Sequence, residues 1–138
     1  MVKFSVKTFG KVIIGGIEFN IIDTNEGFDI IIPEINAVYT HMLGHDCHSI
    51  VPGESGADAI ISNLQNYINN GYGLILTSHY TPEDLKDVET KIIYIKDLKK
   101  IAKTCKNRDE FKSKVDKKYP NYSGKNYLDM TANFFFNN

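Results

Sequence analysis

Residues 37–77, AVYTHMLGHDCHSIVPGESGADAIISNLQNYINNGYGLILT, decide the fold of this chain. An apolar run at residues 37–42 comes first, isoleucine and leucine then recur at helical spacing over residues 60–68, and a second apolar run occupies residues 73–77. This order predicts a strand, a helix and a strand, with Asn70-Gly71 as the helix stop. Because a connection of this length usually joins parallel strands, we expect the two strands to be parallel neighbours.

The residues before this unit have the pattern of a strand meander. Short β-branched runs at residues 11–14, 17–22 and 29–32 are separated by turn-forming residues. Gly15-Gly16 favours a tight hairpin because glycine adopts the positive φ that primed turns need. Residues 30–32 are three consecutive isoleucines, which predicts a strand that is covered on both faces, inside a layered structure.

Helical periodicity dominates the chain after residue 53. Ser55 is the expected N-cap of the first helix, and Thr81-Pro82 is the expected start of a second, long amphipathic helix. Asn107 with Glu110 predicts a capped third helix, and Ser123 is the expected cap of a last helix. No repeat or linker interrupts the pattern, so the chain is expected to be an α/β protein with its helices concentrated in the second half.

Composition narrows the class of protein. The chain has 138 residues, enough for one domain over residues 1–138, and its 16 basic residues nearly balance 17 acidic ones. A field that would attract nucleic acid or an anionic membrane is therefore not expected. The opening residues lack the apolar stretch of a signal peptide, and Cys47 and Cys105 are too few for a disulfide framework. We expect a cytoplasmic protein with both cysteines as thiols.

Three of the four histidines, His41, His45 and His48, lie in one eight-residue stretch, and the fourth, His79, follows the second strand of the parallel pair. Ligands in open α/β sheets gather outside the carboxyl ends of the strands, and both histidine groups follow their strands. Imidazole, carboxylate and thiol groups that meet at such an edge are typical of a metal site. The sequence therefore predicts a metal site that draws on His45, His48, His79 and Asp46.

Each of these residues also has a structural interpretation. Asp46 lies two residues after Gly44 and is equally suited to a turn in which its carboxylate accepts backbone N–H bonds. His79 is also suited to closing the end of its strand, and His41, inside its strand, is expected to be a packed histidine rather than a ligand. His45 and His48 have the spacing for a shared metal, but they also suit a solvated loop.

Several words of the sequence, taken in order, resemble the C-terminal half of a metallo-β-lactamase-fold hydrolase. These words are Gly16-Ile-Glu-Phe-Asn-Ile-Ile, then Asp29-Ile-Ile-Ile-Pro-Glu-Ile-Asn-Ala-Val-Tyr39, then Gly44-His-Asp46, then Leu74-Ile-Leu-Thr-Ser-His79-Tyr-Thr-Pro-Glu83. The resemblance covers residues 11–136. It implies half of an αββα sandwich, with a mixed sheet of about five or six strands followed by C-terminal helices.

The resemblance also implies roles for two of the predicted ligands. Asp46 occupies the position of the aspartate that bridges two metal ions, and His79 occupies the position of a histidine that binds the second metal. The family's first metal site and general base come from a His-x-His-x-Asp-His loop, and this chain contains no such loop. A catalytic zinc needs about three protein ligands, and Asp46 and His79 supply two. Recruitment of His45 or His48 would complete one site for zinc, or alternatively iron or manganese, but without the family's two-metal water activation, so we expect no useful hydrolysis by this chain alone.

The implied fold leaves one face of the sheet without its cover. An apolar sheet face of this size does not stay exposed to water, so we expect either a homodimer or a complementary chain that carries the N-terminal half. Three functions follow from this: a hydrolase-like half that works with a partner, a non-catalytic binding or assembly module, and a small metal-binding protein that uses the cluster around Asp46 alone.

Overall fold

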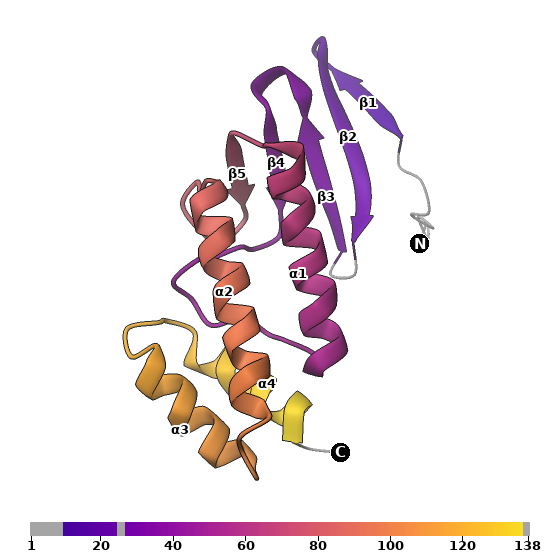
Figure 1. Cartoon of the computed structure of the whole chain (residues 1–138). Coiled ribbons are helices and arrows are strands. Elements are labelled where there is room, and N and C mark those ends of the chain that lie inside the picture. The colour runs from indigo at the N-terminus through magenta and orange to yellow at the C-terminus, as the bar shows by residue number, and fades with distance from the viewer. Residues whose placement is uncertain (1–9, 25–26, 137–138) are drawn as a thin grey trace.

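The structure is a computed structural model that describes residues 10–24 and 27–136. In it, two long helices lie over the sheet and extend past one end of it, and two shorter helices lie beyond that end (Figure 1). Its elements are β1 (Lys11–Ile14), β2 (Ile17–Thr24), β3 (Gly27–Ile32), a 3₁₀ turn η1 (Pro33–Ile35), β4 (Ala37–Thr40), α1 (Gly53–Asn70), β5 (Leu74–Thr77), α2 (Leu85–Ala102), α3 (Arg108–Lys118) and α4 (Lys125–Phe136). Both the mixed α/β class and the concentration of helices in the second half agree with the prediction.

The five strands lie in chain order, β1-β2-β3-β4-β5. The first four pair antiparallel, and β4 pairs parallel with β5 across the α1 connection, with Val38 opposite Ile75. The predicted strand–helix–strand unit is therefore confirmed. The predicted hairpin at Gly15 and Gly16 is also present, and both glycines have positive φ, 59° and 82°.

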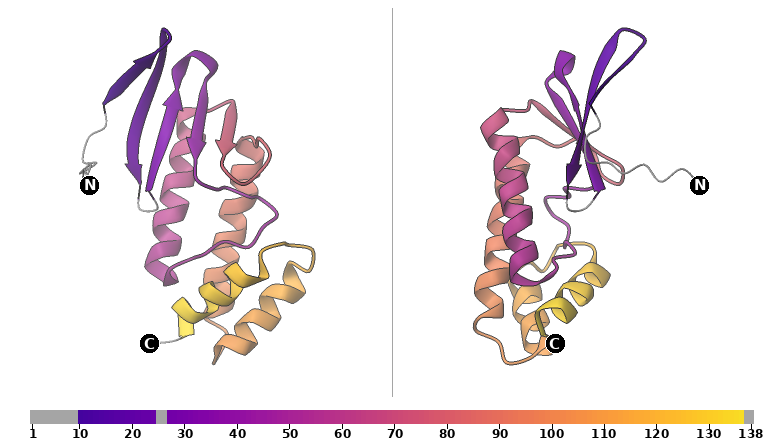
Figure 2. Two further views of the ribbon diagram at one scale, coloured as in Figure 1. Left: turned by 180° about the vertical axis from the view of Figure 1, so that it is seen from behind. Right: turned by 90° about the vertical axis from the view of Figure 1, so that its right-hand side faces the viewer.

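The helices α1 and α2 pack against one face of the sheet, which we call the covered face (Figure 2, right). Val38 of β4 and Ile75 of β5 are buried there, in a cluster with Leu64 of α1 and Ile92 of α2. Ile75 is 0% exposed. Since successive side chains of a strand point to opposite faces, the next residues along these strands belong to the other face.

The other face, which we call the open face, has no cover from residues 10–24 or 27–136 (Figure 2). Ile14 is 64% exposed, Phe28 is 48% exposed and Ile17 is 40% exposed. By strand register, the apolar side chains of this face are Val12, Ile14, Ile17, Phe19, Ile21, Phe28, Ile30, Ile32, Ala37, Tyr39, Leu74 and Leu76, of which Ala37 is buried. Ile30, Ile31 and Ile32 are all partly buried, and the helices of the described residues lie on one side of the sheet or beyond it, so the predicted cover of the second face does not come from these residues.

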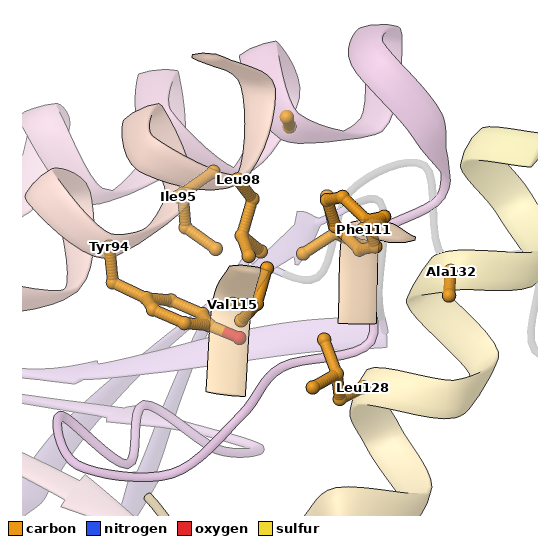
Figure 3. Packing of buried hydrophobic residues seen from close by; sticks show 9 residues of the cluster. Tyr94, Ile95, Leu98, Phe111, Val115, Leu128 and Ala132 are labelled. Atoms are coloured by element: carbon orange, nitrogen blue, oxygen red, sulfur yellow. The ribbon is translucent and has the colours of Figure 1, made fainter. Parts of the chain in front are cut away.

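The second half of the molecule has a closed core. The side chains of α2, α3 and α4 meet around Leu98, Phe111 and Leu128, which are almost completely buried (Figure 3). Phe135 and Phe136, near the C-terminus, lie against the ring of Phe111 with centroid distances of 5.5 and 5.6 Å. Most of the helical layer is thus completed without a partner.

Three predicted helix starts differ from the structure. The last helix, α4, begins at Lys125, so the residue directly before it is Gly124 rather than the expected Ser123. The first helix begins at Gly53 with Pro52 at the N-cap, not Ser55, and no side chain caps it. The long helix begins at Leu85, three residues after Pro82, because the backbone of Glu83 pairs with Ile75 at the edge of β5. Asp84 then caps the helix. The Asn107 cap of α3 and the stop at Gly71 are confirmed.

Candidate functional site

The two histidine-bearing segments meet at the carboxyl ends of β4 and β5, as the parallel pairing predicts. The rings of His41 and His79 lie edge to face with centroids 5.1 Å apart, and the backbone N–H of Ser78 donates to the carbonyl of His41. Both rings are exposed. The pairing of His41 with His79 differs from the expectation that His41 is a packed histidine.

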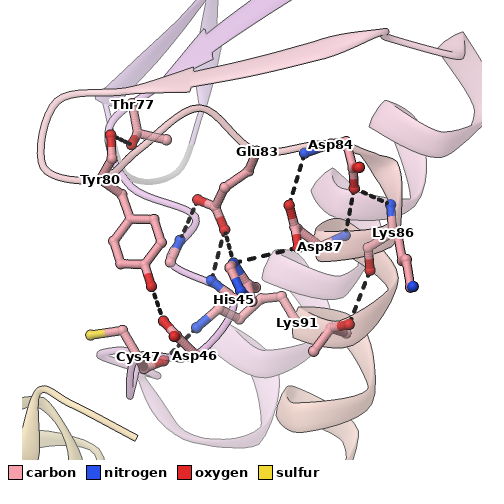
Figure 4. Close-up of polar contacts among 12 residues, drawn as sticks. His45, Asp46, Cys47, Thr77, Tyr80, Glu83, Asp84, Lys86, Asp87 and Lys91 are labelled. Atoms are coloured by element: carbon pink, nitrogen blue, oxygen red, sulfur yellow. Dashed lines mark hydrogen bonds and ion pairs between the residues drawn. The ribbon is translucent and has the colours of Figure 1, made fainter.

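Glu83 connects the loop that carries Gly44 and His45 to the edge of the sheet (Figure 4). Its carboxylate accepts hydrogen bonds from the backbone N–H groups of Gly44, at 2.9 Å, and of His45, at 2.8 Å. The side chain of Glu83 is 1% exposed, so these bonds are shielded from water. A buried carboxylate needs such donors because desolvation otherwise disfavours its charged form.

His45 lies between two carboxylates. Its Nδ1 is 2.7 Å from Oε2 of Glu83 and 3.5 Å from Oδ1 of Asp87, in the first turn of α2. Burial alone would lower the pKa of His45, but the hydrogen bond to Glu83 and the charge of Asp87 outweigh it and raise that pKa above its ordinary value. Among the described residues, these three form the one group of metal-ligating side chains whose ligand atoms all lie within 4.8 Å of one another.

Asp46 and Tyr80 close the other side of this region. The Tyr80 hydroxyl donates to the Asp46 carboxylate, and the Tyr80 ring lies edge to face with His45 at 5.7 Å. Because Tyr80 directly follows His79, this hydrogen bond brings the two segments that carry the predicted ligands Asp46 and His79 to the same end of the sheet (Figure 4). The bond also gives Asp46 a structural partner.

His48 lies in the core rather than with the other histidines. It is fully buried, its Nδ1 is 2.9 Å from the Tyr94 hydroxyl, and its ring also contacts Tyr122. Burial, together with the positive charge of Lys125, lowers the pKa of His48 to about 4. Its Nε2 has no hydrogen-bond partner, and the nearest carboxylate oxygen in an ion-pair arrangement is on Asp116, at 3.9 Å. The structure therefore does not place His48 in a group with His45, Asp46 and His79.

The sequence prediction identified the correct end of the sheet but not the full set of residues there. His45 is part of the three-residue group, whereas Glu83 and Asp87 were not predicted. The signal in the sequence is their spacing: two acids four residues apart, the first of them four residues after His79, at a predicted helix start. In the structure, Glu83 pairs with Ile75 at the edge of the sheet, and Asp87 lies in the capped first turn of α2.

Comparisons with known proteins identify the fold. No family model matches the chain, and no curated protein matches it. Among solved structures, it is similar to the stereoselective inverting sec-alkylsulfatase Pisa1 from Pseudomonas sp., with 14% identity, a TM-score of 0.56, and coverage of 92% of this chain and 25% of the sulfatase. A double mutant of that sulfatase matches with 14% identity, a TM-score of 0.54 and the same coverage. A metallo-beta-lactamase from Pontibacter korlensis is 17% identical over 65% of this chain and 46% of that protein, with a TM-score of 0.48.

The chain therefore has the fold of part of a metallo-β-lactamase-fold domain, as the sequence resemblance implies. It spans about a quarter of the length of the sulfatase structures. The fold, together with the group at His45, makes metal use possible without identifying a metal. In the described residues, no helix has the length and apolar character to cross a membrane.

Proposed function

We propose that this chain is a hydrolase-like half of a metallo-β-lactamase fold that does not hydrolyse substrates alone and that assembles through its open face. The observation that carries the proposal is the apolar character of that face, with Ile14, Ile17 and Phe28 substantially exposed. Contiguous apolar surfaces of this kind usually mark an interaction site in a protein that is folded in water. The favoured occupant is a second copy of the chain, since two-fold dimers are the commonest soluble assembly.

The metal donors support the absence of independent hydrolysis. The full 138-residue sequence contains no His-x-His-x-Asp-His loop. The family positions that remain, Asp46 and His79, supply two donors, and Asp46 already accepts a hydrogen bond from Tyr80. A catalytic zinc usually has three protein ligands and an open position for water, so these two residues alone fit a catalytic metal poorly. With a complementary chain, they would contribute zinc, iron or manganese ligands from this side.

A non-catalytic assembly module is the alternative function. The open face is compatible with both functions, because assembly through it involves none of the predicted metal ligands. The two functions differ in what metal does. A hydrolase-like half should gain activity when a complementary chain and metal are both present, whereas an assembly module should associate equally well in a chelator.

Light scattering on the purified 15.6 kDa chain tests the assembly. We expect a mass near twice that value, and a monomer for Phe28→Lys, which places a charge on the open face. The matched control is Ile93→Lys, since Ile93 is exposed to a similar extent, 60%, but lies on α2, away from the open face. A wild-type monomer with no tendency to associate would contradict the proposal.

Hydrolysis is tested separately. The metal-loaded chain is incubated with thioester, lactam, phosphodiester and alkyl sulfate substrates, and we expect no turnover above the metal-ion blank. Turnover that the wild type shows and His79→Ala lacks would overturn the claim that the chain is inactive alone. Light scattering tests assembly and the turnover assay tests inactivity, so each part of the proposal can be contradicted without the other.

A further inference from the structure

We propose that His45, Glu83 and Asp87 form a mononuclear binding site for a divalent metal ion. This site differs from the pair Asp46 and His79 to which the family resemblance assigns metal. It provides one imidazole nitrogen and two carboxylate oxygens, which suits zinc, manganese or iron(II) rather than a soft cation such as copper(I). The inference concerns binding only, and it does not depend on assembly through the open face.

The distances between the three ligand atoms fit one ion. Nδ1 of His45 is 3.5 Å from Oδ1 of Asp87 and 2.7 Å from Oε2 of Glu83, and all three atoms lie within 4.8 Å of one another. Tetrahedral zinc with ligands at about 2.0–2.2 Å separates neighbouring ligand atoms by roughly 3.4 Å. The distance from His45 to Asp87 already matches, and the distance from His45 to Glu83 needs to open by about 0.7 Å when the ion replaces the proton between them.

Backbone N–H groups orient both carboxylates toward this centre. Glu83 accepts from the N–H groups of Gly44 and His45, which fixes its plane. Asp87 accepts from the N–H of Asp84 through Oδ2, at 3.0 Å, and this leaves Oδ1 directed at His45. Hydrogen bonds of this kind hold metal ligands in place in known sites and raise metal affinity. The preorganisation here therefore extends beyond the three ligands themselves.

The site is accessible from solvent on one side. The side chain of His45 is 34% exposed and that of Asp87 is 27% exposed, whereas that of Glu83 is buried. The Tyr80 ring lies edge to face with the His45 ring. A metal held by three protein ligands with one open side retains a position for water or a small anion. Among the described residues, no other group of three metal-ligating side chains comes this close together.

Cobalt(II) titration tests the site, because its visible absorption reports both binding and coordination number. We expect one cobalt ion per wild-type chain, and an affinity at least tenfold lower in His45→Gln and in Asp87→Asn. Both substitutions preserve approximate shape, and both leave Glu83 in place, because its loss would remove the hydrogen bonds that hold the loop at Gly44 and His45. The matched control is Glu89→Gln, an exposed acid of the same helix, which should bind like the wild type.

Two further variants distinguish this site from the family positions. Asp46→Asn and His79→Gln should keep the stoichiometry and affinity of the wild type. Loss of binding in either of them together with wild-type binding in Asp87→Asn would overturn the proposal and assign the metal to the family positions. Absence of cobalt binding by the wild type at millimolar metal would also overturn it. Circular dichroism spectra that match the wild type would confirm that each variant remains folded.

Discussion

The two faces of the sheet differ both in composition and in surroundings: the covered face mixes apolar residues with polar ones such as Asn20 and Asp29, whereas the open face is almost entirely apolar. On the covered face, Val38 and Ile75 lie beneath α1 and α2 and are almost fully buried. On the open face, Ile14, Ile17 and Phe28 remain substantially exposed. The presence of apolar residues in a strand therefore does not predict which face of the sheet is covered by helices of the same chain. The difference indicates that the stability of the covered face is local, while any contribution of the open face depends on association.

The largest expected effect is on the covered face. Ile75→Ala should lower the free energy of unfolding by about 2–5 kcal/mol, because it leaves a cavity at a fully buried site between the sheet and α2. Urea denaturation followed by circular dichroism measures the loss. A change below about 1 kcal/mol would show that the helices do not seal this face.

Acid should lower the free energy of unfolding through His48, which is buried in the core. Its pKa in the folded state is about 4, against 6.5 ordinarily, so the folded chain binds fewer protons than the unfolded chain between these values. The stability contributed by neutral His48 is therefore complete above pH 6.5 and is lost as the pH falls toward 4, by about 3 kcal/mol in total.

This prediction is measured as the difference in unfolding free energy between pH 7 and pH 4.5. His48→Leu should show a smaller difference than the wild type, and His41→Gln, which changes an exposed histidine, should match the wild type. Equal acid sensitivity in His48→Leu and the wild type would mean that other groups account for the acid loss.

A smaller effect is expected at the first turn of α2, which helps to cover the sheet. Asp84→Ala removes the carboxylate that accepts the N–H groups of Lys86 and Asp87, and should cost about 1 kcal/mol. Asp84→Ser keeps an oxygen acceptor and should recover most of that loss. Thermal unfolding of both variants tests whether the cap, rather than the charge, stabilises the helix.

The smallest expected effect separates the two faces most sharply. Ile17→Ala makes the same chemical change as Ile75→Ala but on the open face, and for the monomer it should cost less than about 1 kcal/mol. The measurement is urea denaturation at low protein concentration. If the loss grows with protein concentration, Ile17 contributes through association. A loss equal to that of Ile75→Ala, independent of concentration, would mean that the open face is covered within the chain.

Local pattern was sufficient to predict the strand–helix–strand unit and the hairpin, because period and turn chemistry are encoded in neighbouring residues. The start of α2 was predicted three residues early because the pairing of Glu83 with Ile75 connects segments that local propensity does not relate. His48 illustrates the same limit: its burial depends on Tyr94 and Tyr122, which lie far along the chain. The group at His45 was predicted only in part, since its carboxylates come from a different segment.

The order of strands in the sheet has a consequence for how the chain folds. Every strand pairs with the next strand in the sequence. The antiparallel hairpins close short loops and form in about 1–10 μs. The parallel pair of β4 and β5 forms across a longer connection that contains α1. We therefore expect the docking of β5 to limit the folding rate, with the antiparallel strands forming early.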